Sequence, residues 1–208
     1  MSVTIVEHPL AAEHLRHLRH KNTARDDFRR HLDGLTSVLL TQALADATCV
    51  PADVETPLGT AGASRLEPMP AIVPVVRAGL GMLEAALRLL PVAPVGFVGM
   101  RRIEADQGVG HECYLESLPS ELEGRPVVVL DPMLATGGSA AEVLRLVAAA
   151  GAGPLTLVCA LAAPEGVEAL RSAAEVHVVT GALDSHLDER KFIVPGLGDA
   201  GDRLYGLA

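Results

Sequence analysis

An acid and a run of small residues follow one apolar segment of the sequence and could together bind a phosphate group. Val127–Leu130 is short, apolar and rich in β-branched side chains, as a buried strand requires, and Asp131 follows it directly. Thr136, Gly137, Gly138 and Ser139 come next and lead into an amphipathic run. Glycines let backbone N–H groups point at an anion, and a helix N-terminus adds positive partial charge. This stretch, residues 126–147, therefore predicts a phosphate site.

Arginines follow two further apolar runs that also have the pattern of buried strands. Residues 70–76 lead into Arg77 and a glycine-containing turn, after which a helix is expected over residues 83–90. Residues 95–100 lead into Arg101 and Arg102. Each of these loops, like residues 131–139, lies directly after a predicted strand.

Strand and helix patterns alternate along most of the chain. The N-terminal segment, residues 1–34, predicts helices with a break near Asn22 and Thr23, and a long helix is expected over residues 32–47. Beyond the phosphate loop, the pattern predicts a helix to residue 150, strands over 155–160 and 176–179, and a helix over 164–174. Such alternation predicts an α/β fold with a mostly parallel central sheet flanked by helices. Loops at the carboxyl ends of its strands meet at one edge, so loops 77–82, 101–102 and 131–139 are expected to form one site.

Three segments outside this alternation complete a single predicted domain, residues 1–208. Residues 48–68 contain several prolines and glycines and predict an irregular segment or small arm. Residues 103–119 have mixed charge and no clear period, which predicts a long flexible loop. Residues 191–208 form a glycine-rich tail that could present bare backbone groups to a flat heterocycle.

The composition excludes several classes of protein. With 49% hydrophobic and 21% charged residues, the 208-residue chain is expected to fold around a sizeable core. A net charge of −9 and only 2% aromatic residues argue against nucleic-acid binding. Residues 146–163 carry no charge, but Gly151 and Pro154 divide them, so no membrane span is expected. Three widely spaced cysteines without a CxxC pattern fit a cytoplasmic location.

Two other patterns resemble functional motifs but are weak indicators of function. Residues 196–201 match GxGxxG, but only seven residues follow, too few for the βαβ unit that dinucleotide binding requires. His14, His17 and His20 recur at three-residue steps and could lie along one side of a helix. We interpret them as a solvated helix surface rather than as metal ligands.

Three motifs, in order, resemble those of the uracil phosphoribosyltransferases, which have the type I phosphoribosyltransferase fold. Residues 131–139 (DPMLATGGS) resemble the family's motif for phosphoribosyl pyrophosphate (PRPP), and residues 73–82 (VPVVRAGLGM) resemble its pyrophosphate loop. Residues 193–203 (IVPGLGDAGDR) resemble its uracil-binding tail. Residues 162–166 and 8–10 match as well, so the resemblance spans nearly the whole chain.

The resemblance implies pyrimidine salvage: transfer of the phosphoribosyl group of PRPP to uracil, giving UMP and pyrophosphate without a covalent nucleophile. It assigns the diphosphate to two arginines, the ribose hydroxyls to Asp131, and a further PRPP contact, through metal or water, to Asp199. The implied PRPP-binding residues are Arg77, Arg102, Asp131, Pro132, Met133, Leu134, Ala135, Thr136, Gly137, Gly138, Ser139 and Asp199. The implied uracil-binding residues, acting mainly through backbone groups, are Ile193, Gly198, Asp199 and Ala200. Arg101 is expected to be solvated.

The resemblance also implies Mg²⁺ as cofactor. Related transferases often place a second acid after the first, whereas Pro132 follows Asp131 here. The ion is therefore expected to be held mainly by PRPP oxygens and water. A homodimer or higher homo-oligomer and GTP as an effector are further implications of the family.

Some positions depart from the family pattern, and they keep other functions open. Gln42 and Ala43 stand where a Tyr–Glu pair is usual, Phe192 replaces a usual tyrosine, and residues 103–119 retain Tyr114 but not the usual spacing of acids and prolines. One alternative is a diverged relative that uses another pyrimidine-like base. The other is a catalytically weak regulator that binds nucleotide and RNA, against which the acidic composition argues.

Overall fold

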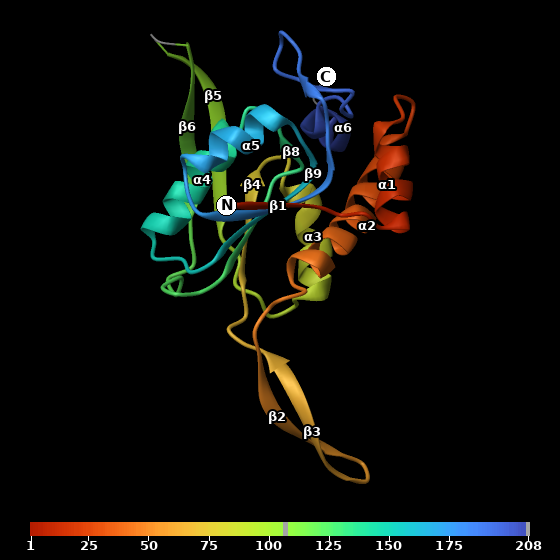
Figure 1. Cartoon of the computed structure of the whole chain (residues 1–208), viewed down its shortest axis with the longest axis vertical. Helices are drawn as coiled ribbons and strands as arrows, with labels where there is room; N and C mark the ends of the chain where they lie inside the picture. The colour runs from red at the N-terminus through yellow and green to blue at the C-terminus, as the bar shows by residue number, and fades with distance from the viewer. Residues whose placement is uncertain (106–107, 207–208) are drawn as a thin grey trace.

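The computed structural model describes residues 1–105 and 108–206, and its description of side chains also leaves out residues 102–105, 108, 109 and 111. A twisted sheet runs through the middle of the molecule, with strands in the order β1-β10-β9-β7-β4-β5-β6 and β8 beside β9 (Figure 1). Its strands are β1 (Ser2–Ile5), β4 (Ala71–Val76), β5 (Phe97–Ala105), β6 (Gly108–Ser117), β7 (Val127–Leu130), β8 (Met133–Leu134), β9 (Leu155–Ala162) and β10 (Val176–Leu183). Neighbouring strands pair in parallel except β5 and β6. The predicted α/β fold with a mostly parallel sheet is confirmed.

Helices cover both faces of this sheet and explain why its central strands are apolar throughout. The helices are α1 (Pro9–Arg19), α2 (Arg25–Ala43), α3 (Leu80–Leu89), α4 (Gly138–Ala149), α5 (Pro164–Arg171) and α6 (Ala200–Tyr205). Alternate residues of β7 point to opposite faces: Val128 and Leu130 join the core formed with α1, α2 and α3, while Val127 and Val129 join the core formed with α4 and α5. Each face excludes water, so β7 needs no polar residue.

The N-terminal segment contains a strand as well as the predicted helices. The predicted break near Asn22 and Thr23 is confirmed, because α1 ends at Arg19 and α2 begins at Arg25. The helix start before residue 32 and the helix expected over 32–47 form one continuous helix, α2. Strand β1 is not predicted by the sequence analysis, and it pairs with β10 at the edge of the sheet.

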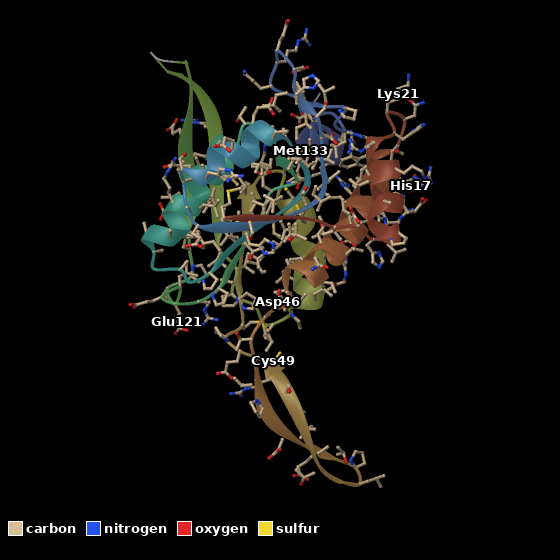
Figure 2. The ribbon with its side chains drawn as sticks, viewed as in Figure 1. His17, Lys21, Asp46, Cys49, Glu121 and Met133 are labelled. Atoms are coloured by element: carbon tan, nitrogen blue, oxygen red, sulfur yellow. The ribbon has the colours of Figure 1, made fainter. Side chains whose placement is uncertain are left out.

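Residues 48–68 form a regular arm rather than an irregular segment. Strands β2 (Cys49–Thr56) and β3 (Gly59–Leu66) pair antiparallel over their full length and project from the body (Figure 1). Leu58, in the turn at the tip, is fully exposed. Cys49 lies at the root of the arm, and Met133 lies within the body (Figure 2). A two-stranded ribbon without a packed face is marginally stable alone in water.

The prediction of a loop over residues 103–119 is wrong for the part of it that the structure describes. Strands β5 and β6 form a long antiparallel hairpin that reaches beyond the sheet. Tyr114, Leu115, Glu116 and Ser117 are all exposed, so this edge ribbon lacks the apolar–polar alternation that identifies a strand in sequence. Residues 106 and 107, part of the departure from the family pattern, lie outside the described residues.

The uncharged stretch of residues 146–163 is divided as expected, since α4 ends at Ala149 and β9 begins at Leu155. In the described parts of the chain, no helix has both the length and the apolar character needed to cross a bilayer.

The N-terminal histidines are packed between helices and do not form a fully solvated surface. The Nδ1 atoms of His14 and His31 lie 3.0 Å apart, and the rings of His17 and His31 stack at 3.9 Å. His14 is partly buried against Gly34, whereas His20 is exposed beyond the end of α1. Among the described residues, no group of three or more His, Cys, Asp or Glu side chains is arranged to hold a metal ion.

These contacts predict a pH dependence of stability. Burial lowers the pKa of both His14 and His31 below the ordinary value of 6.5. Unfolding restores that value, so below about pH 6.5 the unfolded chain binds more protons and stability falls as pH falls through this value. We expect the free energy of unfolding in urea to decrease between about pH 7.5 and 5.5, and to decrease less in the double variant His14→Gln/His31→Gln. Equal decreases in both proteins would contradict this assignment.

Candidate active site

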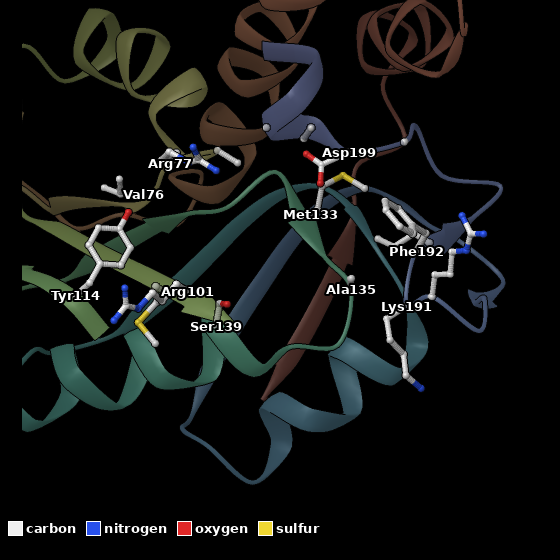
Figure 3. Close-up of a pocket in the computed structure, with 17 residues that line it drawn as sticks. Val76, Arg77, Arg101, Tyr114, Met133, Ala135, Ser139, Lys191, Phe192 and Asp199 are labelled. Carbon is white, nitrogen blue, oxygen red and sulfur yellow. The ribbon is translucent and has the colours of Figure 1, made fainter. Parts of the chain in front are cut away.

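A cavity of about 700 Å³ opens at the carboxyl edge of the sheet, between the loop after β4, the β5–β6 hairpin and the C-terminal tail (Figure 3). The three loops predicted to converge do so here. The predicted site residues that line it are Arg77, Met133, Ala135, Ser139, Ile193, Gly198, Asp199 and Ala200. Residues from the phosphate motif and from the tail thus face the same space.

A smaller hollow of about 50 Å³ adjoins this cavity and is formed by the phosphate motif. Met133, Ala135 and Ser139 line both spaces, which makes them neighbours. The other predicted residues that line the hollow are Asp131, Leu134, Thr136, Gly137 and Gly138. Helix α4 begins at Gly138, so its free N–H groups and its positive partial charge lie at this hollow. Such a hollow suits a phosphate group.

Gly137 is required by the geometry of this turn. Its φ of 78° lies in the left-handed region, which side chains other than glycine rarely adopt. A Cβ atom there would lie 2.7 Å from the carbonyl oxygen of Gly166, at the start of α5. The phosphate loop can therefore pack this closely on α5 only because residue 137 has no side chain.

Asp131 and Pro132 join the phosphate loop to the sheet. The Asp131 N–H donates to the Val158 carbonyl at 3.2 Å, and its Oδ1 accepts from the Met133 N–H at 3.4 Å. The Pro132 carbonyl accepts from the N–H groups of Ala160 and Leu161 at 3.0 and 3.1 Å. Pro132 lines neither cavity. It anchors the loop on β9, while Asp131 faces the hollow.

The arginines occupy different positions around the cavity. Arg77 is exposed on the loop after β4, and its carbonyl accepts from the Tyr205 hydroxyl at 3.2 Å. Burial raises the pKa of Tyr205, which keeps this hydroxyl protonated. Arg101 is exposed as expected, but it also lines the cavity and forms an ion pair with Glu112 at 2.8 Å. The side chain of Arg102 lies outside the described residues.

The tail forms the far wall of the cavity. Strands β11 (His186–Leu187) and β12 (Ile193–Val194) pair antiparallel and lead into a turn that ends at α6. Asp199 caps α6, since its Oδ1 accepts from the Asp202 N–H at 2.9 Å. Helix α6 (Ala200–Tyr205) begins within the GxGxxG pattern of residues 196–201.

Sequence reasoning did not assign several residues that line the cavity. Tyr114 was noted only as a residue that the family retains, and Phe192 only as a replacement of a usual tyrosine. The two lie on opposite sides of the cavity (Figure 3). Met100, Arg190 and Lys191 were not singled out. Two adjacent basic residues just before the tail motif were a usable signal for the last two. Among the residues whose side chains the structure describes, four basic ones line the cavity: Arg77, Arg101, Arg190 and Lys191.

Comparison with known proteins gives concordant matches over the whole chain. A family model described as uracil phosphoribosyltransferase matches residues 5–207. Proteins named uracil phosphoribosyltransferase from a Nocardioides species and from Kocuria rhizophila are 47% and 46% identical, with 100% of this chain and 99% of each relative covered. The structure of the AQ2163 protein from Aquifex aeolicus superposes with a TM-score of 0.93 at 36% identity, covering 99% of both chains. A hypoxanthine phosphoribosyltransferase from Staphylococcus aureus, at 12% identity and a TM-score of 0.53, shares the fold.

Proposed function

The chain belongs to the uracil phosphoribosyltransferase family, and we propose that its cavity transfers the phosphoribosyl group of PRPP to uracil, forming UMP and pyrophosphate. The observation that carries this proposal is the shared wall of the two spaces. The phosphate hollow at α4 shares Met133, Ala135 and Ser139 with the larger cavity, which is also lined by basic side chains and by the tail. One substrate can therefore span from a phosphate site to a base site.

The side chains suit the charges that develop in this reaction. Breaking the bond at the anomeric carbon of ribose produces positive charge on the sugar and releases a highly anionic pyrophosphate. The loop of residues 135–139 and the start of α4 would hold the 5′-phosphate, and Asp131 would accept hydrogen bonds from the ribose hydroxyls. Arg77 and Arg102 would bind the diphosphate through their guanidinium forks. Catalysis then depends on positioning and electrostatics.

Mg²⁺ fits the residues present only if PRPP supplies most of its ligands. Asp131 and Asp199 are the carboxylates among the residues assigned to PRPP, and the described residues contain no cluster of acids and histidines able to hold a metal. Mg²⁺ commonly keeps several waters and binds substrate phosphates with one or two carboxylates. When bound in this way, it would neutralise the leaving pyrophosphate.

The tail would recognise uracil by backbone groups. Ile193, Gly198, Asp199 and Ala200 line the cavity, and Ile193 and Ala200 are otherwise buried. Uracil presents carbonyl acceptors and N–H donors along one edge. Cytosine carries an amino donor in place of one carbonyl, so a site built for uracil would leave polar groups unpaired with it, at a large energetic cost.

An assay of pyrophosphate release from purified protein with PRPP and Mg²⁺ tests this function. We expect turnover with uracil and 5-fluorouracil, and a kcat/KM for cytosine at least about 100-fold lower. A folded protein that binds PRPP but releases no pyrophosphate with uracil would overturn the proposal. Turnover with a different pyrimidine alone would favour the diverged relative, which the presence of Phe192 in the cavity wall makes worth testing.

Three further parts of the proposal have separate support. The exposed β2–β3 arm lies apart from the core, which supports a homo-oligomer in which a second copy covers the arm. GTP as an effector is supported by family resemblance alone. A cytoplasmic location is supported by the free cysteines, one of which, Cys49, is exposed. These proposals involve neither nucleic acid nor membrane as partner.

A further inference from the structure

An ion pair between a buried aspartate and a partly exposed arginine lies behind the tail, outside the cavity wall. Asp184 follows β10 directly, and its side chain is only 5% exposed. Arg19, the last residue of α1, approaches it with both terminal nitrogens: Nη2 donates to Oδ1 at 2.6 Å and Nη1 to Oδ2 at 2.8 Å. This two-pronged arrangement fixes both the distance and the orientation of the two groups.

The same pair binds both backbone polar groups of one tail residue, Gly196. The Gly196 N–H donates to Oδ2 of Asp184 at 2.8 Å, and Nη1 of Arg19 donates to the Gly196 carbonyl at 2.9 Å. Gly196 has a φ of 61°, and a Cβ atom there would overlap the Ile193 carbonyl oxygen. Burial alone would raise the pKa of Asp184, but the hydrogen bonds from Arg19 and Gly196 outweigh it and the pKa is lowered. The carboxylate therefore stays ionised and bound.

The partners of this pair belong to rigid elements. The Asp184 N–H donates to the Ala162 carbonyl at the end of β9 at 2.8 Å, which fixes Asp184 on the central sheet. Arg203 makes a second attachment between α1 and the tail, donating to the Leu197 carbonyl at 2.9 Å and to the His20 carbonyl at 2.8 Å. The tail turn is thus held between the sheet and α1.

We propose that the Arg19–Asp184 pair is the positioning element of the base-reading loop, residues 193–200, and this inference rests on the proposed function. Gly196 lies between Ile193 and Gly198, which line the cavity, whereas neither Arg19 nor Asp184 lines it. Backbone groups can discriminate between bases only while the backbone stays in place. Burying the Asp184 carboxylate and part of the Arg19 side chain removes water from both groups, so such a pair is seldom the most stabilising way to fill the space. We infer that the Arg19–Asp184 pair is present because it fixes the backbone conformation of the base-reading loop.

Two variants separate positioning from stability. Asp184→Asn keeps the shape of the side chain but leaves one acceptor oxygen, which cannot serve both the Arg19 fork and the Gly196 N–H. The double variant Arg19→Met/Asp184→Leu removes both charges and retains apolar packing. We expect each to raise KM for uracil about tenfold, to leave KM for PRPP within about twofold, and to accelerate hydrogen exchange of the amides in residues 193–198. The double variant should keep a Tm close to that of the wild type.

Asp33→Asn is the matched control, since it removes a different arginine–aspartate pair, the one with Arg88 that joins α2 and α3 away from the cavity. We expect it to change neither KM nor hydrogen exchange in the loop. Exchange in Asp184→Asn equal to that in Asp33→Asn would overturn the inference, as would equal rises of both KM values together with a lowered Tm. If the wild type does not use uracil, the proposed function fails, yet hydrogen exchange still decides whether the pair holds the loop.

Discussion

Replacing Asp131 by asparagine is expected to lower kcat/KM for PRPP by at least about 100-fold while changing the free energy of unfolding by less than about 1 kcal/mol. The carboxylate lies at the phosphate hollow, where it would accept hydrogen bonds from ribose and offset the positive charge that develops on the sugar. An amide keeps the volume and can still accept from the Met133 N–H, one of the contacts of Asp131 in the structure. Steady-state kinetics and urea unfolding measure the two effects.

A role for Asp131 as a mere structural cap would produce a different result. Activity and stability would then fall together. Asp27→Asn supplies the comparison, because Asp27 is a partly exposed aspartate on α2 whose partner, Arg30, lies on the same helix. We expect this variant to retain wild-type kinetics and stability. A drop in stability in Asp131→Asn that accounts for its lost activity would contradict the assignment.

The second large effect concerns the arginines of the cavity. Arg77→Met is expected to lower kcat/KM for PRPP by about 100-fold, because an uncharged side chain cannot bind the leaving pyrophosphate. Arg77→Lys should recover part of this loss, since it restores the charge but not the two-pronged donor. Arg101→Met serves as the matched variant from the same cavity. Its guanidinium already pairs with Glu112, so we expect a loss of no more than about fivefold.

Kinetics with varied PRPP at saturating uracil distinguish the two arginines. Equal losses in Arg77→Met and Arg101→Met would mean that the cavity attracts PRPP by its total charge. A larger loss in Arg101→Met would reverse the assignment. Thermal unfolding of all three variants shows whether the fold is retained, which the exposure of both side chains leads us to expect.

The central part of the fold could be predicted from sequence because burial there is symmetrical. Strand β7 has apolar residues on both faces, and its bounds agree with the predicted run. The loops after β4 and β7 were identified by glycines and by the arginine or aspartate at the strand end. These signals are local, since each depends on a few adjacent residues.

The peripheral strands could not be predicted because their pairing, not their burial, stabilises them. The arm β2–β3 exposes most of its side chains, as do residues 114–117 of β6, so neither segment shows a period of two in hydrophobicity. Strand β1 has only four residues and pairs along one edge with β10. In each case the stabilising partner is a backbone strand, which a hydrophobicity pattern does not report.

The site also has one part that the sequence predicted and another that it did not. The phosphate hollow is made by consecutive residues and was predicted nearly complete. The contacts behind the base-reading loop join residues far apart in sequence: Arg19 and Asp184 are 165 positions apart. Neither residue belongs to a local motif, so only the folded chain brings them together.

The cations around the cavity have a consequence for how fast the two substrates arrive. The chain carries a net charge of −9, yet Arg77, Arg101, Arg190 and Lys191 gather at one opening. A concave, low-dielectric opening focuses such a local field, which accelerates capture of a polyanion. Added salt shortens the range of this field to about 8 Å at physiological ionic strength. Raising the ionic strength should therefore lower the association rate of PRPP. The association rate of uracil, a neutral molecule, should not change.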